Sequence, residues 1–421
     1  MKIKIAEKTY SEVMALDVPR HEKPKKIGVF FRTLIKALSA TNLKGNHIKY
    51  NEHGMERLGK KEPCLILMNH SSFIDMQIAA NYLYPRPFST VCTTDAYMGK
   101  AWLMRQIGCI PTQKFVADLT LIKDISYALK ELKSSVLMYP EAMYSFDGTA
   151  SALPETVGKL VKMLKVPVVT IITHGAFSRE PIYNMLRHRN VDISADVTYL
   201  LSPEEIETVS AEDINAMIGE KFSFDSFRWQ QENKIIINED FRADGLERVL
   251  YKCPHCLAEG KTVGKGIHLV CNNCGKKYEL TELGYLSATN GESAFNHIPD
   301  WFAWEREQVK EELNQGKYLL DIDVDVYMLV DTKALYHIGG GHLTHNSEGF
   351  RLVSDDNELD YSQSALSSYS LNADYFWYEI GDMISIGNKR HLFYCFPKKA
   401  EEAIVAKAKL SADELYKIKK K

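Results

Sequence analysis

The segment from residue 67 to residue 77 reads LMNHSSFIDMQ and places a histidine, His70, five residues before an aspartate, Asp75. An imidazole can remove the proton of a hydroxyl group near neutral pH. A carboxylate on the other ring nitrogen fixes the tautomer and stabilises the imidazolium that forms. The pair therefore has the groups needed to activate a hydroxyl for attack on an acyl thioester, although an isolated pair of this kind is more often structural.

The spacing restricts which elements can hold this pair. Five residues along one continuous helix turn two side chains about 140° apart, so His70 must precede a helix that begins near Asp75. The apolar run at 64–68, CLILM, predicts a buried strand before the histidine, and residues 73–82 predict the helix after it. Ser71 or Ser72 is expected to cap this helix with its hydroxyl group.

A second group of chemically competent residues is formed by two Cys-x-x-Cys pairs: Cys253, Cys256, Cys271 and Cys274. Four thiolates brought together by two turns form a tetrahedral zinc site. Because all four ligands are cysteines, no position is left open for catalysis, and the zinc is expected to be structural. Iron is the alternative metal, and His255 or His268 would give an alternative Cys/His ligand set.

Residues 63–200 alternate short apolar runs with helical patterns, as in the apolar stripe at 119–132 followed by the run at 136–139. Another apolar run, VPVVTIIT, lies at 166–173. Continuous apolar strands that alternate with helices are typical of an α/β layer with a mostly parallel sheet.

The character of the sequence changes after residue 250. The residues around the cysteines resemble a zinc ribbon or rubredoxin-like knuckle, and a short helix is expected at 299–315. Alternating strand patterns at 318–397 and a charged helix at 399–418 predict a small antiparallel β-rich domain, for which a pleckstrin-homology-like fold is one interpretation. The glycines at 339–341 predict a turn within it, with His337, His342 and His345 at a solvated hairpin tip.

Composition limits the partners. The chain has 421 residues and a formal net charge of -3, so no global basic field attracts nucleic acid. The lysines near the cysteines lack the interleaved aromatic residues that stack bases, which argues against nucleic-acid binding. No secretory signal or spanning segment is recognised, and the basic, apolar pattern at 26–40 predicts an amphipathic helix. A cytoplasmic protein attached peripherally to a membrane face is expected.

The histidine–aspartate segment resembles the first of four ordered blocks in the glycerol-phosphate/lysophosphatidate acyltransferase family. The second block is similar to IGCIPTQKF at 107–115 and the third to YPEAMYS at 139–145, while the fourth is similar to VPVV at 166–169. The resemblance implies a split β-α architecture with His70 as general base and Asp75 as its orienting group. It also implies a set of substrate-binding residues: Asn69, Ser72, Gly108, Lys114, Pro140 and Glu141.

By the same resemblance, the donor is acyl-CoA or acyl-carrier-protein and the acceptor is a lysophospholipid or glycerol-phosphate hydroxyl. The third block departs from the family, because 142–144 read Ala-Met-Tyr where Gly-Thr-Arg is usual. The arginine expected to hold a phosphate is missing, and Lys114, Arg105 or Arg179 would have to supply the cation. A glycolipid, an aminolipid or a differently held lysophospholipid therefore stays open as the acceptor.

Four parts are predicted: a membrane-associating segment at 1–45, an acyltransferase domain at 46–250, the knuckle at 251–281, and a linker helix with the β-rich domain at 282–421. The competing interpretation is a catalytically weak scaffold with the acyltransferase fold. Such a scaffold would bind lipid or a protein partner through its zinc and β modules.

Overall fold

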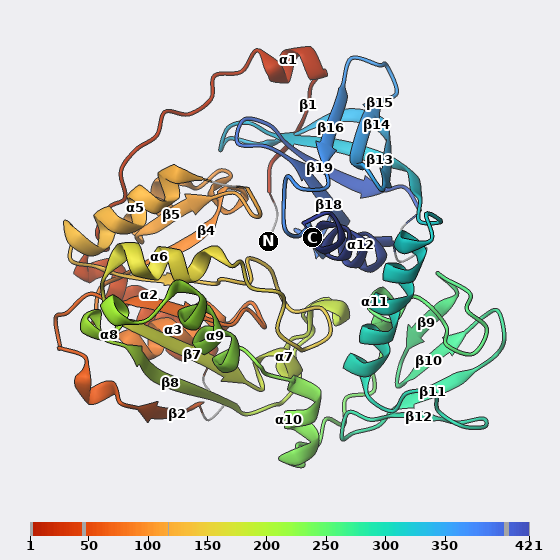
Figure 1. Ribbon diagram of the computed structural model, residues 1–421, viewed down its shortest axis with the longest axis horizontal. Helices are drawn as coiled ribbons and strands as arrows, with labels where there is room; N and C mark the ends of the chain where they lie inside the picture. The colour runs from red at the N-terminus through yellow and green to blue at the C-terminus, as the bar shows by residue number, and fades with distance from the viewer. Residues whose placement is uncertain (1–2, 44–47, 117, 400–403, 421) are drawn as a thin grey trace.

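The computed structural model describes residues 3–43, 48–116, 118–399 and 404–420. Figure 1 shows an α/β layer, a small sheet beside α11 (Ile298–Asn314), and a larger sheet that carries α12 (Ile404–Lys420). In the described part of the chain, no helix is long and apolar enough to cross a bilayer.

The α/β layer is built on a seven-stranded sheet in the order β2-β8-β7-β3-β6-β4-β5. Neighbouring strands run parallel except for β7 and β8, which are antiparallel. The strands are β2 (Ile48–His53), β3 (Leu65–Met68), β4 (Phe88–Thr93), β5 (Cys109–Thr112), β6 (Ser135–Met138), β7 (Val168–His174) and β8 (Ile193–Leu201).

Helices cover both faces of this sheet. The helices are α2 (Val29–Asn42), α3 (Asp75–Leu83), α4 (Ala101–Gln106), α5 (Leu119–Lys130), α6 (Thr156–Leu164), α7 (Ala176–Arg179), α8 (Pro203–Thr208), α9 (Ala211–Lys221) and α10 (Ser226–Glu232). Alternate residues of β3 face opposite sides: Leu65 and Leu67 pack in the core with α5, α6 and α9, whereas Ile66 packs in the core with α3. This two-sided burial explains why β3 is apolar at every position.

The knuckle segment forms an antiparallel sheet of four strands: β9 (Thr262–Lys265), β10 (His268–Cys271), β11 (Lys277–Leu280) and β12 (Leu286–Ala288). The last strand lies beyond residue 281, where the sequence predicts the module to end. Trp301 of α11 is fully buried against this sheet, with its ring centroid 5.1 Å from that of Tyr278 and its Nε1–H donated to the Lys252 carbonyl. The tryptophan therefore fixes the module to α11.

The C-terminal domain (residues 318–420) is a sheet in the order β16-β15-β14-β13-β19-β18-β17. Its strands are β13 (Leu320–Leu329), β14 (Leu335–Asn346), β15 (Gly349–Ser354), β16 (Asp360–Ser364), β17 (Asn372–Trp377), β18 (Gly381–Gly387) and β19 (Leu392–Pro397). The short N-terminal strand β1 (Ile5–Glu7), which precedes α1 (Tyr10–Met14), pairs in parallel with β14. The pleckstrin-homology interpretation stays a prediction.

The predicted glycine turn in this domain is wrong. Residues 339–341 lie within β14, and a Cβ atom on Gly341 would meet the Val353 carbonyl oxygen at 2.8 Å. The glycine therefore permits a close backbone approach inside the sheet rather than a turn. His345 is consequently not solvated, since it is 1% exposed and lies 3.0 Å from the Tyr318 hydroxyl.

Candidate functional site

The polar residues of the first three blocks meet where parallel strands end. His70 follows β3, Lys114 follows β5 and Glu141 follows β6. Because these strands run parallel, their carboxyl ends lie at one edge of the sheet, which is where α/β proteins place ligands.

The His70 imidazole and the Asp75 carboxylate are in direct contact. Nδ1 of His70 lies 3.1 Å from Oδ2 of Asp75, and the Asp75 side chain is 1% exposed. The same oxygen accepts the backbone N–H groups of Ser71 at 2.7 Å and Ser72 at 2.9 Å. An ionised carboxylate accepts, so Nδ1 donates its proton, and Nε2 keeps the lone pair that a base needs.

The predicted serine cap is wrong. The helix begins at Asp75, the preceding cap position is Ile74, and no side chain caps the first turn. Instead, the backbone N–H groups of Ser71 and Ser72 donate to the Asp75 carboxylate, because a charged acceptor competes well for N–H donors at a helix start. The carboxylate therefore organises both the loop and the imidazole.

Aromatic rings cover both faces of the imidazole. The ring centroid of His70 lies 4.1 Å from that of Tyr139 at an interplanar angle of 21°. The Tyr144 ring lies at 4.0 Å and 34°. Burial lowers the pKa of His70, Asp75 opposes this effect, and the positive charge of Lys114 lowers the pKa further. These effects together favour the neutral form of the imidazole, whose side chain is 17% exposed.

Glu141 joins the loops after β3 and β6. Its Oε2 accepts the His70 backbone N–H at 3.0 Å, and its Oε1 accepts the Ser151 N–H at 2.7 Å. Burial raises the pKa of Glu141 to about 8, against the effect of these two hydrogen bonds. Both oxygens are engaged by backbone donors, an arrangement that positions the His70 loop. A contact of Glu141 with the acceptor stays a prediction.

Asn69 and Ser72 are likewise engaged by the protein. The Asn69 side chain accepts the Thr173 N–H at 2.8 Å and donates to the Thr173 carbonyl at 3.1 Å, which ties the end of β3 to β7. The Ser72 hydroxyl donates to Glu180 at 3.3 Å. These hydrogen bonds fix the loop after β3. The contact of Asn69 and Ser72 with substrate stays a prediction.

The remaining predicted binding residues, Gly108, Lys114 and Pro140, lie in different loops. Gly108 precedes β5 with φ of +83°, a left-handed conformation that favours glycine, and Pro140 is buried in the turn after β6. Lys114 is near enough for its charge to act on His70. Of the other two candidate cations, Arg105 pairs with Glu22 at 2.8 Å and Arg179 pairs with Glu180.

Tyr139 and Tyr144 were missed as site residues in the sequence. They bracket the third block, and Tyr144 stands where the family usually has arginine. The unusual residue at this position was the indication that the sequence offered.

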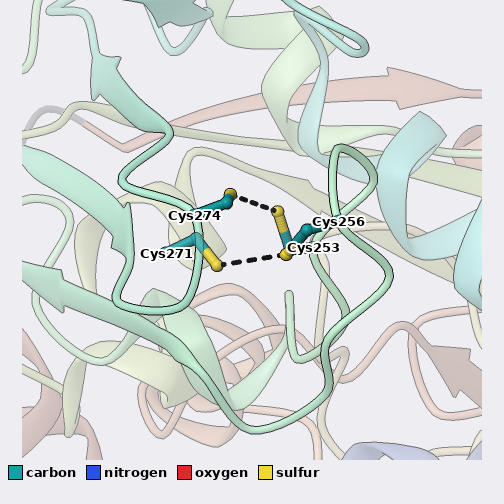
Figure 2. Close-up of side chains that lie close together, drawn as sticks. All are labelled: Cys253, Cys256, Cys271 and Cys274. Carbon is teal, nitrogen blue, oxygen red and sulfur yellow. Dashed lines mark hydrogen bonds between the residues drawn. The ribbon is translucent and has the colours of Figure 1, made fainter.

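The four paired cysteines form a cluster at the turns of the knuckle (Figure 2). All four Sγ atoms lie within 4.8 Å of one another, with 3.8 Å between Cys253 and Cys274 and 3.7 Å between Cys256 and Cys271. Zn–S bonds of roughly 2.3 Å in a tetrahedron separate the sulfurs by about 3.8 Å. The donor set therefore fits a tetrahedral thiophilic metal ion.

The backbone of the two knuckles is alike. Leu257 and Gly275 each follow the second cysteine of a pair, with φ of +62° and +72°. The Leu257 N–H returns to the Cys253 carbonyl and the Gly275 N–H to the Cys271 carbonyl, both at 2.8 Å. Two equivalent turns thus aim their thiols at one point.

Residues 49–174 match the family model described as Acyltransferase, a range that holds all four blocks. Among solved structures, the chain is similar to the crystal structure of the 1-acyl-sn-glycerophosphate (LPA) acyltransferase PlsC from Thermotoga maritima, with 13% identity and a TM-score of 0.34. This likeness covers 46% of this chain and 79% of that chain. No curated protein sequence matches the chain.

Proposed function

We propose that this chain, whose residues 49–174 match the family model described as Acyltransferase, transfers an acyl group from a thioester to a lipid hydroxyl. The observation that carries the proposal is the 3.1 Å contact between His70 Nδ1 and Asp75, which leaves Nε2 as the base. The donor is acyl-CoA or acyl-carrier-protein, and the acceptor is of the lysophospholipid or glycerol-phosphate type.

In the proposed reaction, Nε2 of His70 takes the proton of the acceptor hydroxyl as its oxygen attacks the thioester carbonyl. Asp75 stabilises the imidazolium that results. Collapse of the tetrahedral intermediate breaks the C–S bond, and the imidazolium returns the proton to the departing thiolate. Lys114 is the expected cation on the acceptor side, and Glu141 holds the loop.

A membrane surface is the proposed working place. The exposed apolar side chains of α2 lie near those of α4, and together they form an apolar face: Val29, Phe30, Leu34, Leu38, Trp102 and Leu103. The ring centroids of Phe31 and Trp102 lie 6.2 Å apart, which joins the two helices. The exposed Lys25 and Lys26 precede α2 in the chain, a combination suited to a bilayer interface with anionic lipid.

The cysteine cluster is proposed to hold a structural zinc ion. Two of the nearby lysines, Lys252 and Lys276, are 7% and 8% exposed and bond to protein groups. They are therefore poor candidates for phosphate contacts, which favours a structural module over a nucleic-acid-binding one.

The competing function is a scaffold that binds lipid or protein without turnover. Met143, one of the altered positions of the third block, and the nearby Phe146 are buried in a hydrophobic core shared with the C-terminal domain rather than open to substrate. This observation favours the scaffold, whereas the intact His70–Asp75 contact favours catalysis.

The deciding experiment incubates the purified chain with acyl-CoA or acyl-carrier-protein and a panel of acceptors. The panel contains glycerol 3-phosphate, lysophosphatidate, lysophosphatidylcholine, monoacylglycerol and a lyso-aminolipid, with products read by mass spectrometry. Acylation of at least one acceptor by the wild type is expected, with the rate about 10²- to 10⁴-fold lower in His70→Ala. Binding of lipid without any acylated product would favour the scaffold.

A further inference from the structure

Three of the four sides of the His70 imidazole are covered by protein. Nδ1 faces Asp75, and the two ring faces are covered by Tyr139 and Tyr144. Among the described residues, no hydrogen bond engages Nε2, and this edge is the one proposed to meet an incoming hydroxyl. The two aromatic faces differ in origin, because Tyr139 follows β6 directly whereas Tyr144 lies further along the third block.

The residues around Tyr144 are anchored in the C-terminal domain. Met143 and Phe146 are 1% and 4% exposed and belong to the same core as β13, β18 and β19. The ring of Phe146 lies 4.4 Å from that of Tyr375 on β17. On the other side, the Ser145 N–H donates to the His70 carbonyl at 3.0 Å. One short segment therefore contacts both the C-terminal domain and the histidine.

The turn after Tyr375 is conformationally strained. Phe376, Tyr378 and Glu379 all have left-handed φ angles, of 50°, 47° and 66°. Phe146, two residues after Tyr144, contacts Tyr375 at the start of this segment, and burial raises the pKa of Tyr144, with the charges of Asp75 and Asp374 adding to this effect. Strain of this kind persists where surrounding contacts impose it, and it is common at functional sites.

We propose that Tyr144 is a positioning residue through which the docking of the C-terminal domain holds the His70 imidazole and stabilises its protonated form. This inference rests on the proposed function, since it assigns His70 as the base. The altered third block is then an adaptation: the position that usually holds arginine supplies a stacking ring, and its neighbours form the domain contact.

The physical reason lies in the charge that His70 acquires during the reaction. An imidazolium between two phenol rings is attracted by their π faces, most strongly where water is excluded. The groups that face His70 are the Asp75 carboxylate, the Lys114 ammonium and the rings of Tyr139 and Tyr144, with Glu141 at its backbone. Removing one ring therefore disfavours the imidazolium without changing any formal charge.

The test uses Tyr144→Leu, which fills the space without a π face, and Tyr144→Phe, which keeps the ring. Tyr144→Leu is expected to lower kcat about 3- to 30-fold with KM nearly unchanged. An NMR titration of His70 should show its midpoint at lower pH than in the wild type. Tyr144→Phe should stay close to the wild type in both measurements.

The domain contact is tested at Tyr375, which touches no residue of the histidine loop in the contacts described. Tyr375→Leu should shift kcat and the His70 midpoint in the same direction as Tyr144→Leu. Tyr361→Leu is the matched control. Tyr361 lies on β16, at the edge of the sheet opposite β17, and its ring lies 5.0 Å from that of Phe393. It should leave both measurements unchanged.

Wild-type kcat and midpoint in Tyr144→Leu would overturn the positioning role. Equal effects of Tyr375→Leu and Tyr361→Leu would overturn the link to the C-terminal domain. If the wild type acylates no acceptor, the proposed function fails, yet the NMR midpoints still decide whether Tyr144 and Tyr375 act on His70. Thermal unfolding of each variant identifies losses that arise from misfolding.

Discussion

His70 is held in the state that its proposed reaction needs. Burial disfavours the imidazolium and lowers the pKa of His70, so the ring is neutral and able to accept a proton. Once His70 has taken up the proton, the Asp75 carboxylate stabilises the imidazolium. The residue therefore combines a neutral resting base with a stabilised protonated intermediate.

At the residue scale, Asp75→Asn is expected to lower kcat about 10²- to 10⁴-fold. An amide N–H facing Nδ1 would favour the tautomer that carries its proton on Nε2, which cannot act as the base. The pH dependence follows from the lowered pKa of His70: activity falls on acidification, with a kcat midpoint below the pKa of an ordinary histidine.

Because Asp75 raises the pKa of His70, its removal should move that midpoint to still lower pH. Steady-state kinetics between pH 4.5 and 9 check both statements. A midpoint that moves to higher pH, or full activity in Asp75→Asn, would contradict this account of the base.

At the scale of elements, the loops that end β3, β6 and β7 hold one another. Glu141 bonds the His70 backbone and Asn69 bonds Thr173, so the base is fixed from two neighbouring strands.

The knuckle is the opposite case. Its sheet has few apolar residues of its own, and a small module of this kind depends on a metal ion and on α11 for stability.

Glu141→Gln is expected to destabilise the fold by about 1–3 kcal/mol, because its NH₂ group would leave one buried backbone N–H without an acceptor. If Glu141 positions the His70 loop, kcat falls while KM changes little. Denaturant unfolding and steady-state kinetics measure the two effects, with exposed Glu131→Gln as the control. A large rise in KM at unchanged kcat would instead assign Glu141 to acceptor binding.

The knuckle is expected to contain one zinc ion per chain, measured by elemental analysis. Cys274→Ser or a strong chelator should release it, lower the melting temperature and shift the fluorescence of buried Trp301 to longer wavelength. Cys92→Ser lies outside the cluster and should retain the metal. An unchanged melting temperature after metal removal would contradict a structural role.

The sequence predicted the elements whose residues carry their own periodicity. The apolar run at 64–68 became β3 (Leu65–Met68), and the stripe at 119–132 became α5 (Leu119–Lys130). The serine cap and the glycine turn failed because contacts distant in sequence decided them: a carboxylate in one case and the neighbouring strand β15 in the other. The contact between the rings of Tyr144 and His70 joins two segments distant in sequence, which no local pattern encodes.

At the scale of the whole molecule, one hydrophobic core joins all three parts. It contains Phe146 of the α/β layer, Leu269 of the knuckle, Trp301 of α11 and Phe393 of the C-terminal domain. Figure 1 shows the C-terminal domain and α11 lying along one side of the α/β layer. The apolar face of α2 and α4 lies outside this core, which leaves it available to a membrane.

Binding to vesicles of phosphatidylcholine and phosphatidylserine tests this face. Phe30→Ser combined with Leu38→Ser should weaken binding at least 10-fold, because each side chain loses about 1.5–3 kcal/mol of apolar burial. Leu366→Ser, on the C-terminal domain, is a comparably exposed control and should bind as the wild type does. Equal binding by all three proteins would contradict the assignment of this face to the membrane.

The most direct test of the central claim is the ratio of kcat between the wild type and His70→Ala on the best acceptor of the panel. A base that abstracts the hydroxyl proton predicts a loss of about 10²- to 10⁴-fold with an unchanged fold and metal content. A His70→Ala protein that transfers acyl groups within 10-fold of the wild-type rate would contradict the account.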